Sequence, residues 1–188
     1  MIDWSKLKAY ETDQKKSFEE LCYQIARLEF DEKGTFTSVD DSGGGDGVEF
    51  YMTLPNGEQW GWQAKFYLDG SLSISNRKKS IKSSLEKAIK VHPDLKKWYL
   101  CMPKDLTPGE KEWFDTTLKK VIPEELSIDL DFWGESDLIY FMGDPKFSGR
   151  KNYFFGDLEL TFDWFNTQVS NQLTVIHGKY IPAVHSQT

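Results

Sequence analysis

The sequence predicts an α/β protein in which a mixed central sheet is flanked by helices. Two segments of alternating apolar and polar residues surround Pro55-Asn56-Gly57, which predicts a β-hairpin. Segments with helical periodicity precede and follow this hairpin. Trp98–Met102 is a continuous apolar run of the kind found in buried parallel strands. Strands that alternate with helices in this way are typical of a sheet covered by helices.

The composition indicates a folded protein. The chain has 188 residues, 39% of them hydrophobic and 15% aromatic, which fits one domain or one domain with an appendage. No apolar run approaches the roughly 18 residues that span a bilayer, and the first residues do not form a signal peptide. We therefore expect a cytoplasmic protein with no membrane partner. Cys22 and Cys101 lie in apolar segments, so we expect them to be reduced core residues.

The first predicted helix begins at Ser17. Glu20 follows three residues later, which is the spacing of a capping box. Apolar residues then recur at helical spacing as far as Leu28, and we expect the helix to end before Gly34. Thr35–Val39 contains β-branched residues and is predicted to be a short strand.

The predicted hairpin brings three polar side chains together. Its strands are expected in Val48–Leu54 and Trp60–Lys65, because Asn-Gly between two alternating segments favours a tight turn. Gln63 and Lys65 are two residues apart and therefore lie on one face of their strand. Asp46 is expected near Lys65, at the open end of the hairpin. A carboxylate, an amide oxygen and an ammonium group in this arrangement suit metal-assisted cleavage of a phosphodiester.

This part of the chain resembles the Mrr-like branch of the PD-(D/E)XK nuclease superfamily. The resemblance is carried by Gly44-Gly45-Asp46-Gly47, by Gln63-Ala64-Lys65 and by Phe18-Glu19 near the start of a helix. It extends roughly from Ser17 to Met102. It implies a restriction-endonuclease-like fold and metal-dependent cleavage of double-stranded DNA. No recognition helix or base-reading segment is evident in the sequence, so we expect little sequence preference.

The resemblance also implies roles for individual residues. The residues expected to hold Mg²⁺, with Mn²⁺ as an alternative, are Asp46, Glu19, Gln63 and the backbone carbonyl of Ala64. Lys65 is expected to orient the attacking water or to neutralise developing charge. Glu20 is the alternative to Glu19, and both carboxylates equally suit the positive end of a helix.

Other interpretations of these residues remain open. A strand that faces solvent also produces a Gln-x-Lys pattern. Gln63 stands where the family has a carboxylate, and Mg²⁺ prefers anionic oxygen ligands. The main alternative is therefore a catalytically inactive nuclease fold that serves DNA binding or assembly. A protein-interaction domain that uses exposed aromatic residues is a further alternative. We interpret Glu49 as a solvated strand residue.

A basic helix is predicted at Arg77–Val91. The net charge of −7 argues against nucleic-acid binding by the whole surface, but a local basic face can still contact phosphates. The residues predicted to contact the nucleic acid are Arg77, Lys78, Lys79 and Lys82. A basic helix of this kind can also be merely a solvated surface.

Elements after the minimal core are expected to extend the sheet. A helix starts near Thr107, a strand covers Ser127–Trp133, and a short helix ends at Met142, so residues 1–143 are predicted to form a nuclease-like core with an α/β extension. Asp144–Asn152 is expected to be a loop. Residues 144–188 as a whole are expected to contain a C-terminal helix, Leu158–Leu173, and a tail.

The C-terminal segment carries a second resemblance. The residues Lys179-Tyr180-Ile181-Pro182-Ala183-Val184-His185 resemble the junction that leads from an effector domain into the ATPase of STAND-type antiphage defence proteins such as the Avs group. This resemblance implies that the chain is the nuclease effector module of a longer protein. It also implies self-association through that larger parent protein.

Overall fold

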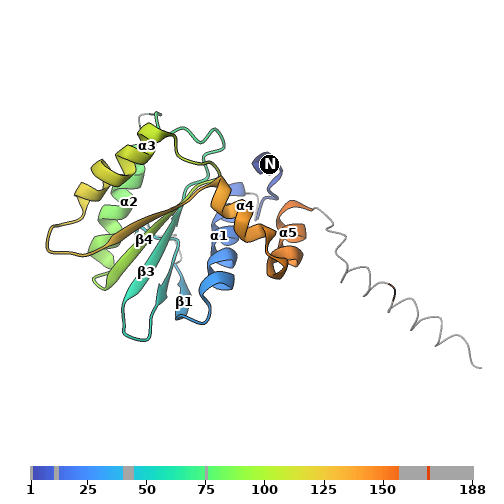
Figure 1. Ribbon diagram of the computed structural model, residues 1–188, viewed down its shortest axis with the longest axis horizontal. Helices are drawn as coiled ribbons and strands as arrows, with labels where there is room; N and C mark the ends of the chain where they lie inside the picture. Colours follow the sequence, from blue (N-terminus) through green and yellow to red (C-terminus); the bar gives the residue numbers. More distant parts are fainter. Residues whose placement is uncertain (1, 11–12, 40–44, 75, 157–168, 170–188) are drawn as a thin grey trace, which may run out of the picture.

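The computed structural model describes residues 2–10, 13–39, 45–74, 76–156 and 169. Five strands form one sheet in the order β1-β2-β3-β4-β5, and helices cover both of its faces (Figure 1). The prediction of an α/β protein with a mixed sheet flanked by helices is confirmed. The helix Leu158–Leu173 and the C-terminal junction motif lie outside the described residues, apart from residue 169.

The sheet combines antiparallel and parallel pairing. Its strands are β1 (Thr35–Ser38), β2 (Phe50–Thr53), β3 (Gln59–Ala64), β4 (Leu95–Cys101) and β5 (Asp129–Trp133). The first three pair antiparallel, whereas β4 runs parallel to β3 and β5 runs parallel to β4. Parallel neighbours require crossover connections, and these are supplied by helices.

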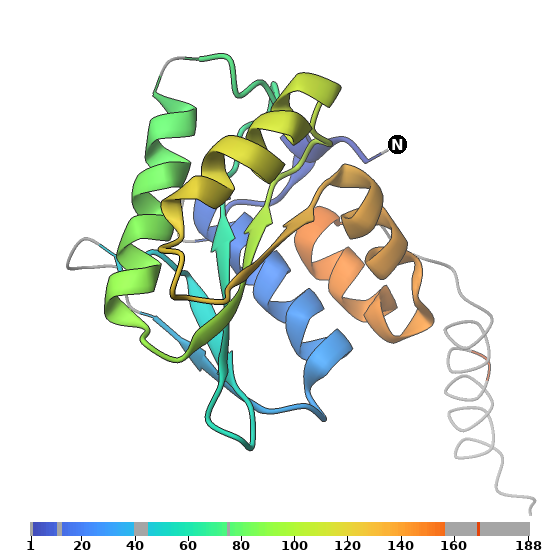
Figure 2. The same ribbon diagram turned by 60° about the vertical axis from the view of Figure 1, so that its left-hand side comes forward.

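The two crossover helices cover one face of the sheet. α2 (Arg77–Val91) connects β3 to β4, and its bounds agree with the predicted basic helix. α3 (Pro108–Glu112) connects β4 to β5 and continues through π-helical and 3₁₀ turns as far as Val121. Two views show α2 and α3 on the same side of the sheet (Figures 1 and 2). At the start of α3, the Glu110 carboxylate accepts a hydrogen bond of 2.9 Å from the Thr107 backbone, as a capping box requires.

The other face is covered by α1 (Gln14–Phe30), α4 (Glu135–Gly143) and α5 (Ser148–Phe155) (Figure 2). The predicted start of the first helix at Ser17 is wrong. The N-cap is Asp13, whose carboxylate accepts a hydrogen bond of 2.8 Å from the Lys15 backbone. Asp caps a helix as effectively as Ser, and Ser17 is instead buried within the helix.

The expectation of a loop at Asp144–Asn152 is also wrong. Residues Pro145–Phe147 form a 3₁₀ turn, and α5 follows directly. Phe147 and Phe154 are both buried, seven residues apart on the same helical face. Polar residues between them conceal this spacing in the sequence.

The hairpin between β2 and β3 is confirmed, and its turn is formed by Pro55-Asn56-Gly57. Gly57 donates a hydrogen bond of 2.9 Å to the Leu54 carbonyl, and Leu54 donates one of 2.8 Å to Glu58. Among the glycines, Gly57 has a positive φ of 89°, which fits a turn followed by a left-handed residue. The register pairs Phe50 with Trp62.

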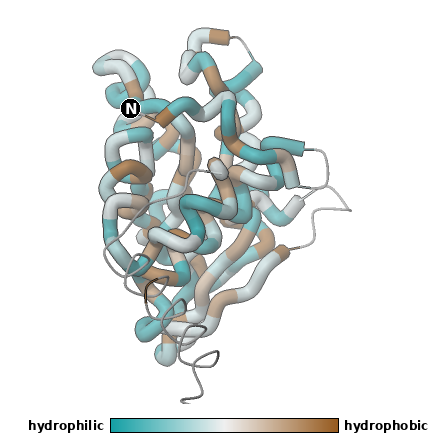
Figure 3. Tube along the Cα trace, turned by 90° about the vertical axis from the view of Figure 1, so that its right-hand side faces the viewer, coloured by the Kyte–Doolittle hydropathy of each residue, from teal (hydrophilic) through white to brown (hydrophobic). Residues whose placement is uncertain are grey.

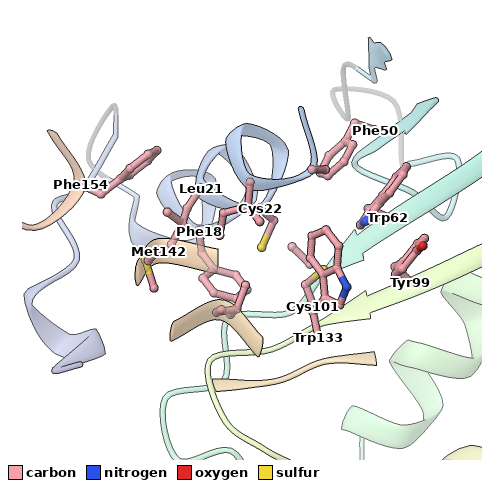
Figure 4. Close-up of a cluster of buried hydrophobic side chains, with 14 of the residues drawn as sticks. Phe18, Leu21, Cys22, Phe50, Trp62, Tyr99, Cys101, Trp133, Met142 and Phe154 are labelled. Carbon is pink, nitrogen blue, oxygen red and sulfur yellow. The ribbon is translucent and has the colours of Figure 1, made fainter. Parts of the chain in front are cut away.

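Aromatic side chains dominate the core between the sheet and α1. Trp62 stacks on Tyr99 with ring centroids 4.6 Å apart and on Phe50 at 5.2 Å. Figure 4 shows these rings beneath α1, together with Cys22 and Cys101. Both cysteines are buried and free, as predicted, and burial raises the pKa of the Cys101 thiol, with the neighbouring Cys22 adding to this effect. A second apolar cluster lies between the sheet and α2.

Hydrophobic and hydrophilic stretches alternate along the chain (Figure 3). Within the described residues, no helix is both long enough and apolar enough to cross a membrane.

Candidate functional site

A cavity of about 250 Å³ lies between β3, the segment that enters β2, and one face of α2. The residues that line it are Gly45, Gly47, Val48, Glu49, Gln63, Lys65, Ser80, Ser83, Ser84 and Lys87. Most of these residues are polar or charged. Two of the predicted site residues, Gln63 and Lys65, therefore share one cavity, at the end of β3 where its parallel neighbour β4 also ends. Ligands commonly bind at the carboxyl ends of parallel strands.

Glu49 is the carboxylate of this cavity. The Gln63 side-chain amide donates a short hydrogen bond to the Glu49 carboxylate. Gln63 is only 4% exposed, so this contact fixes a buried amide beside a half-buried acid. Antiparallel pairing places the two residues together, because Phe50 faces Trp62 and Glu49 is the next residue outward.

The donor set around Gln63 fits a divalent cation. Its amide nitrogen also lies 3.3 Å from the backbone carbonyl oxygen of Ala64, so the oxygens of Glu49 and Ala64 converge on one N–H₂ group. If the side-chain amide of Gln63 flips, its oxygen takes the place of the nitrogen and lies beside these two oxygens. Three converging oxygens, one of them anionic, are ligands that Mg²⁺ and Mn²⁺ accept. The residues present thus fit such an ion, although with a single carboxylate.

A backbone hydrogen bond to the neighbouring strand fixes the position of Lys65 beside the cavity. Its N–H donates a hydrogen bond of 2.9 Å to the carbonyl of Cys101, which continues the parallel ladder beyond the end of β3. The side chain is half-buried and lines the cavity together with Glu49 and Gln63. A cation in this position is suited to a phosphate group.

The glycine before β2 shapes the cavity by a close approach to α2. Gly47 has φ 81°, and a Cβ atom there would lie 3.0 Å from the Cα of Ala88 and closer still to the Ser84 carbonyl. The Gly47 carbonyl accepts a hydrogen bond of 3.1 Å from the Trp98 indole. Only a residue without a side chain allows the backbone to pass between the helix and the sheet here.

Asp46 is not grouped with Gln63 and Lys65 in the lining of the cavity. Asp46 is half-buried and does not line the cavity, although Gly45 and Gly47 do. Its negative charge acts instead on His92, at the end of α2. Burial lowers the pKa of His92, and the charge of Asp46 opposes this change. The hairpin brings Glu49, rather than Asp46, beside Gln63.

Glu19 is half-buried on α1, which covers the face of the sheet opposite to α2. It is not among the residues that line the cavity. Its neighbour Phe18 packs against Phe66, one residue after Lys65, with ring centroids 5.3 Å apart. Glu20 accepts a hydrogen bond of 2.7 Å from Gln24.

The residues predicted to contact nucleic acid lie on α2 outside the cavity lining. Arg77 forms an ion pair with Asp69, donates a hydrogen bond of 2.6 Å to the Ser71 carbonyl, and lies 4.2 Å from the centre of the Tyr67 ring. The side chain of Arg77 therefore fixes the segment that leads into α2.

The three lysines of the predicted set differ in their surroundings. Lys78 lies 5.1 Å from the centre of the Trp113 ring, and Lys82 is 3.8 Å from Glu86. Lys79 is exposed. These side chains lie on the surface of α2 and stay candidates for contact with a nucleic acid.

No family model matches the chain, and no curated protein matches its sequence. Within the described part of the chain, no group of three or more His, Cys, Asp or Glu residues could hold a metal ion. The candidate site therefore rests on mixed carboxylate, amide and carbonyl ligands.

Two features of the site are missing from the sequence prediction. Glu49 could have been found by counting the register from a three-residue turn, Pro55-Asn56-Gly57, which places Glu49 opposite Gln63. The spacing of Ser80, Ser83, Ser84 and Lys87 marks one face of a helix, and this face lines the cavity.

Proposed function

We propose that this chain is a metal-dependent endodeoxyribonuclease with a restriction-endonuclease-like fold. The observation that carries the proposal is the convergence of Glu49, Gln63 and Lys65 on one polar cavity. The order of α1, the β1–β3 strands, α2 and β4 supports it, because it is the order that the resemblance to Mrr-like nucleases implies. The Gln-x-Lys pattern lies at the end of β3, the central strand of the sheet.

Each residue has a role that follows from its chemistry. Glu49 and Gln63, with the Ala64 carbonyl, would hold Mg²⁺ or Mn²⁺. When bound, such an ion supplies Lewis acidity and lowers the pKa of a bound water. Lys65 would bind the phosphate and neutralise the charge that develops on it, an electrostatic effect worth about 10²–10³ in rate at comparable sites. Gly47 holds the backbone close to α2 and so sets the width of the cavity.

Two of the residues predicted to hold the metal ion, Asp46 and Glu19, keep that proposed role. Asp46 and Glu19 lie outside the cavity lining, so their participation requires a movement of the chain or bridging waters when substrate and metal bind. The role of effector in a defence protein, with self-association through a larger parent, rests on the C-terminal sequence and is part of the proposal.

Nicking of supercoiled plasmid in Mg²⁺ or Mn²⁺ tests the function. The wild type should convert supercoiled into open-circular DNA, and Lys65→Ala and Glu49→Gln should each lower the rate by about 10²-fold or more. Lys6→Ala, an exposed lysine on the opposite side of the sheet, is the matched control and should retain full activity. If all four proteins nick equally, the activity is a contaminant. If the wild type binds DNA without nicking it, the chain is a DNA-binding module with a nuclease fold.

A further inference from the structure

One wall of the cavity is a face of α2 made of hydroxyl groups. Ser80, Ser83, Ser84 and Lys87 are spaced as neighbours on one side of the helix, and all four line the cavity opposite β3. Ser84 is half-buried, and the other three are exposed. This serine face is distinct from the lysines that were predicted to contact DNA.

We propose that the serine face, with Lys87, binds the sugar-phosphate backbone of the strand to be cut, across the cavity from Lys65. This inference rests on the proposed function. Hydroxyl groups donate hydrogen bonds to phosphate oxygens without regard to base identity, and Lys87 adds one positive charge. The cavity of about 250 Å³ is below the roughly 300–1,000 Å³ of typical ligand pockets, so it suits a phosphate group rather than a nucleobase.

The surroundings of α2 favour this face over the rest of the helix. Arg77 is committed to Asp69 and Tyr67, and Lys78 lies over the Trp113 ring. The serine face is the side of α2 that shares a cavity with Gln63 and Lys65. A phosphate that contacts Lys65 is therefore within the same enclosure as the serine hydroxyls.

A consequence is that only the two lysines of the cavity, and not its serines, contribute to the salt dependence of DNA binding. The salt dependence measures how many phosphates are neutralised by cations, with a slope of log Kobs against log[salt] of about −0.9 for each phosphate. If Lys65 and Lys87 each neutralise one phosphate, together they contribute about −1.8 to this slope. The neutral serine hydroxyls contribute to the binding affinity but do not change the slope of log Kobs against log[salt].

The test is fluorescence anisotropy of a labelled DNA duplex with the full chain in EDTA, over a series of NaCl concentrations. Lys87→Ala should make the slope less negative by about 0.9. Ser80→Ala and Ser83→Ala should each weaken binding about tenfold, as expected for a lost hydrogen bond to a charged group, and leave the slope unchanged. Ser148→Ala, on α5 at the opposite face of the sheet, and Lys6→Ala are matched controls and should bind like the wild type.

The outcomes separate this inference from the proposed function. Wild-type affinity in both serine variants, or a wild type that does not bind the duplex, overturns the inference. A slope that becomes less negative in Lys79→Ala but is unchanged in Lys87→Ala also overturns the inference, because the phosphate contact then lies on the outer face of α2. Loss of affinity in the serine variants of a protein that nicks no plasmid supports the inference and refutes the nuclease proposal. Alanine stabilises a helix better than serine, so unfolding would not explain a loss of binding by the serine variants.

Discussion

The replacement of Gly47 by alanine tests how the cavity is built. Gly47 has φ 81°, a conformation that costs an alanine about 1–2 kcal/mol. The added Cβ would lie 3.0 Å from the Ala88 Cα and closer still to the backbone of Ser84. Since these contacts are with a helix backbone, the helix or the strand must shift, at a further cost of about 1–3 kcal/mol. Gly47→Ala should therefore lower the free energy of unfolding by about 2–5 kcal/mol.

Gly57→Ala is the matched control. Gly57 has φ 89°, and a Cβ there would meet no atom within 4 Å. Its replacement should cost only the conformational term of about 1–2 kcal/mol. Urea titration of the three proteins, with unchanged m values, measures the difference. Equal destabilisation by the two substitutions would refute the close packing of Gly47 against α2, and with it the account of the cavity wall.

Three further predictions concern residues outside the cavity. Burial lowers the pKa of His92 below its unfolded value of about 6.5. The stability that neutral His92 provides is therefore present above that pH and is lost as the pH falls through the folded pKa. His92→Gln should flatten the decline in unfolding free energy on acidification, and an unchanged profile would contradict this. Phe154→Ala should cost about 3–5 kcal/mol in a urea titration because its ring is buried, whereas the exposed Tyr153→Ala should cost little; similar values would mean that α5 does not pack on the core. The hydrogen bond from Arg77 lowers the pKa of Asp69, so Arg77→Ala should raise that pKa in a carboxyl NMR titration, and no change would show that the ion pair does not form in solution.

Local sequence signals predict most of the fold. Pro93 follows α2 closely, and the bounds of that helix are predicted correctly because a proline cannot continue it. The apolar run at Trp98–Met102 correctly indicates a parallel strand, since both faces of β4 are covered. The 3₁₀ turn at Pro145–Phe147 and α5 are missed because their buried residues, Phe147 and Phe154, are seven residues apart with mostly polar residues between them.

The site is predicted less completely than the fold. Gln63 and Lys65 lie on one face because strand periodicity requires it. The position of Asp46 could not be predicted by the same rule, because Asp46 precedes β2, and Gly47 between them has a positive φ and approaches α2 closely. That departure depends on tertiary packing, which no local pattern encodes. Glu49 follows from the register of the hairpin once its turn is fixed.

The location of the metal ion is the most direct test of the central claim, that Glu49 and Gln63 form the ligand set of a nuclease. Anomalous diffraction from crystals of the chain soaked in Mn²⁺ would locate the ion. The account predicts a peak in the cavity, within ligand distance of the Glu49 carboxylate and the Ala64 carbonyl, and its loss in Glu49→Gln. A peak between Asp46 and His92, or no peak in the cavity at a saturating Mn²⁺ concentration, would contradict it.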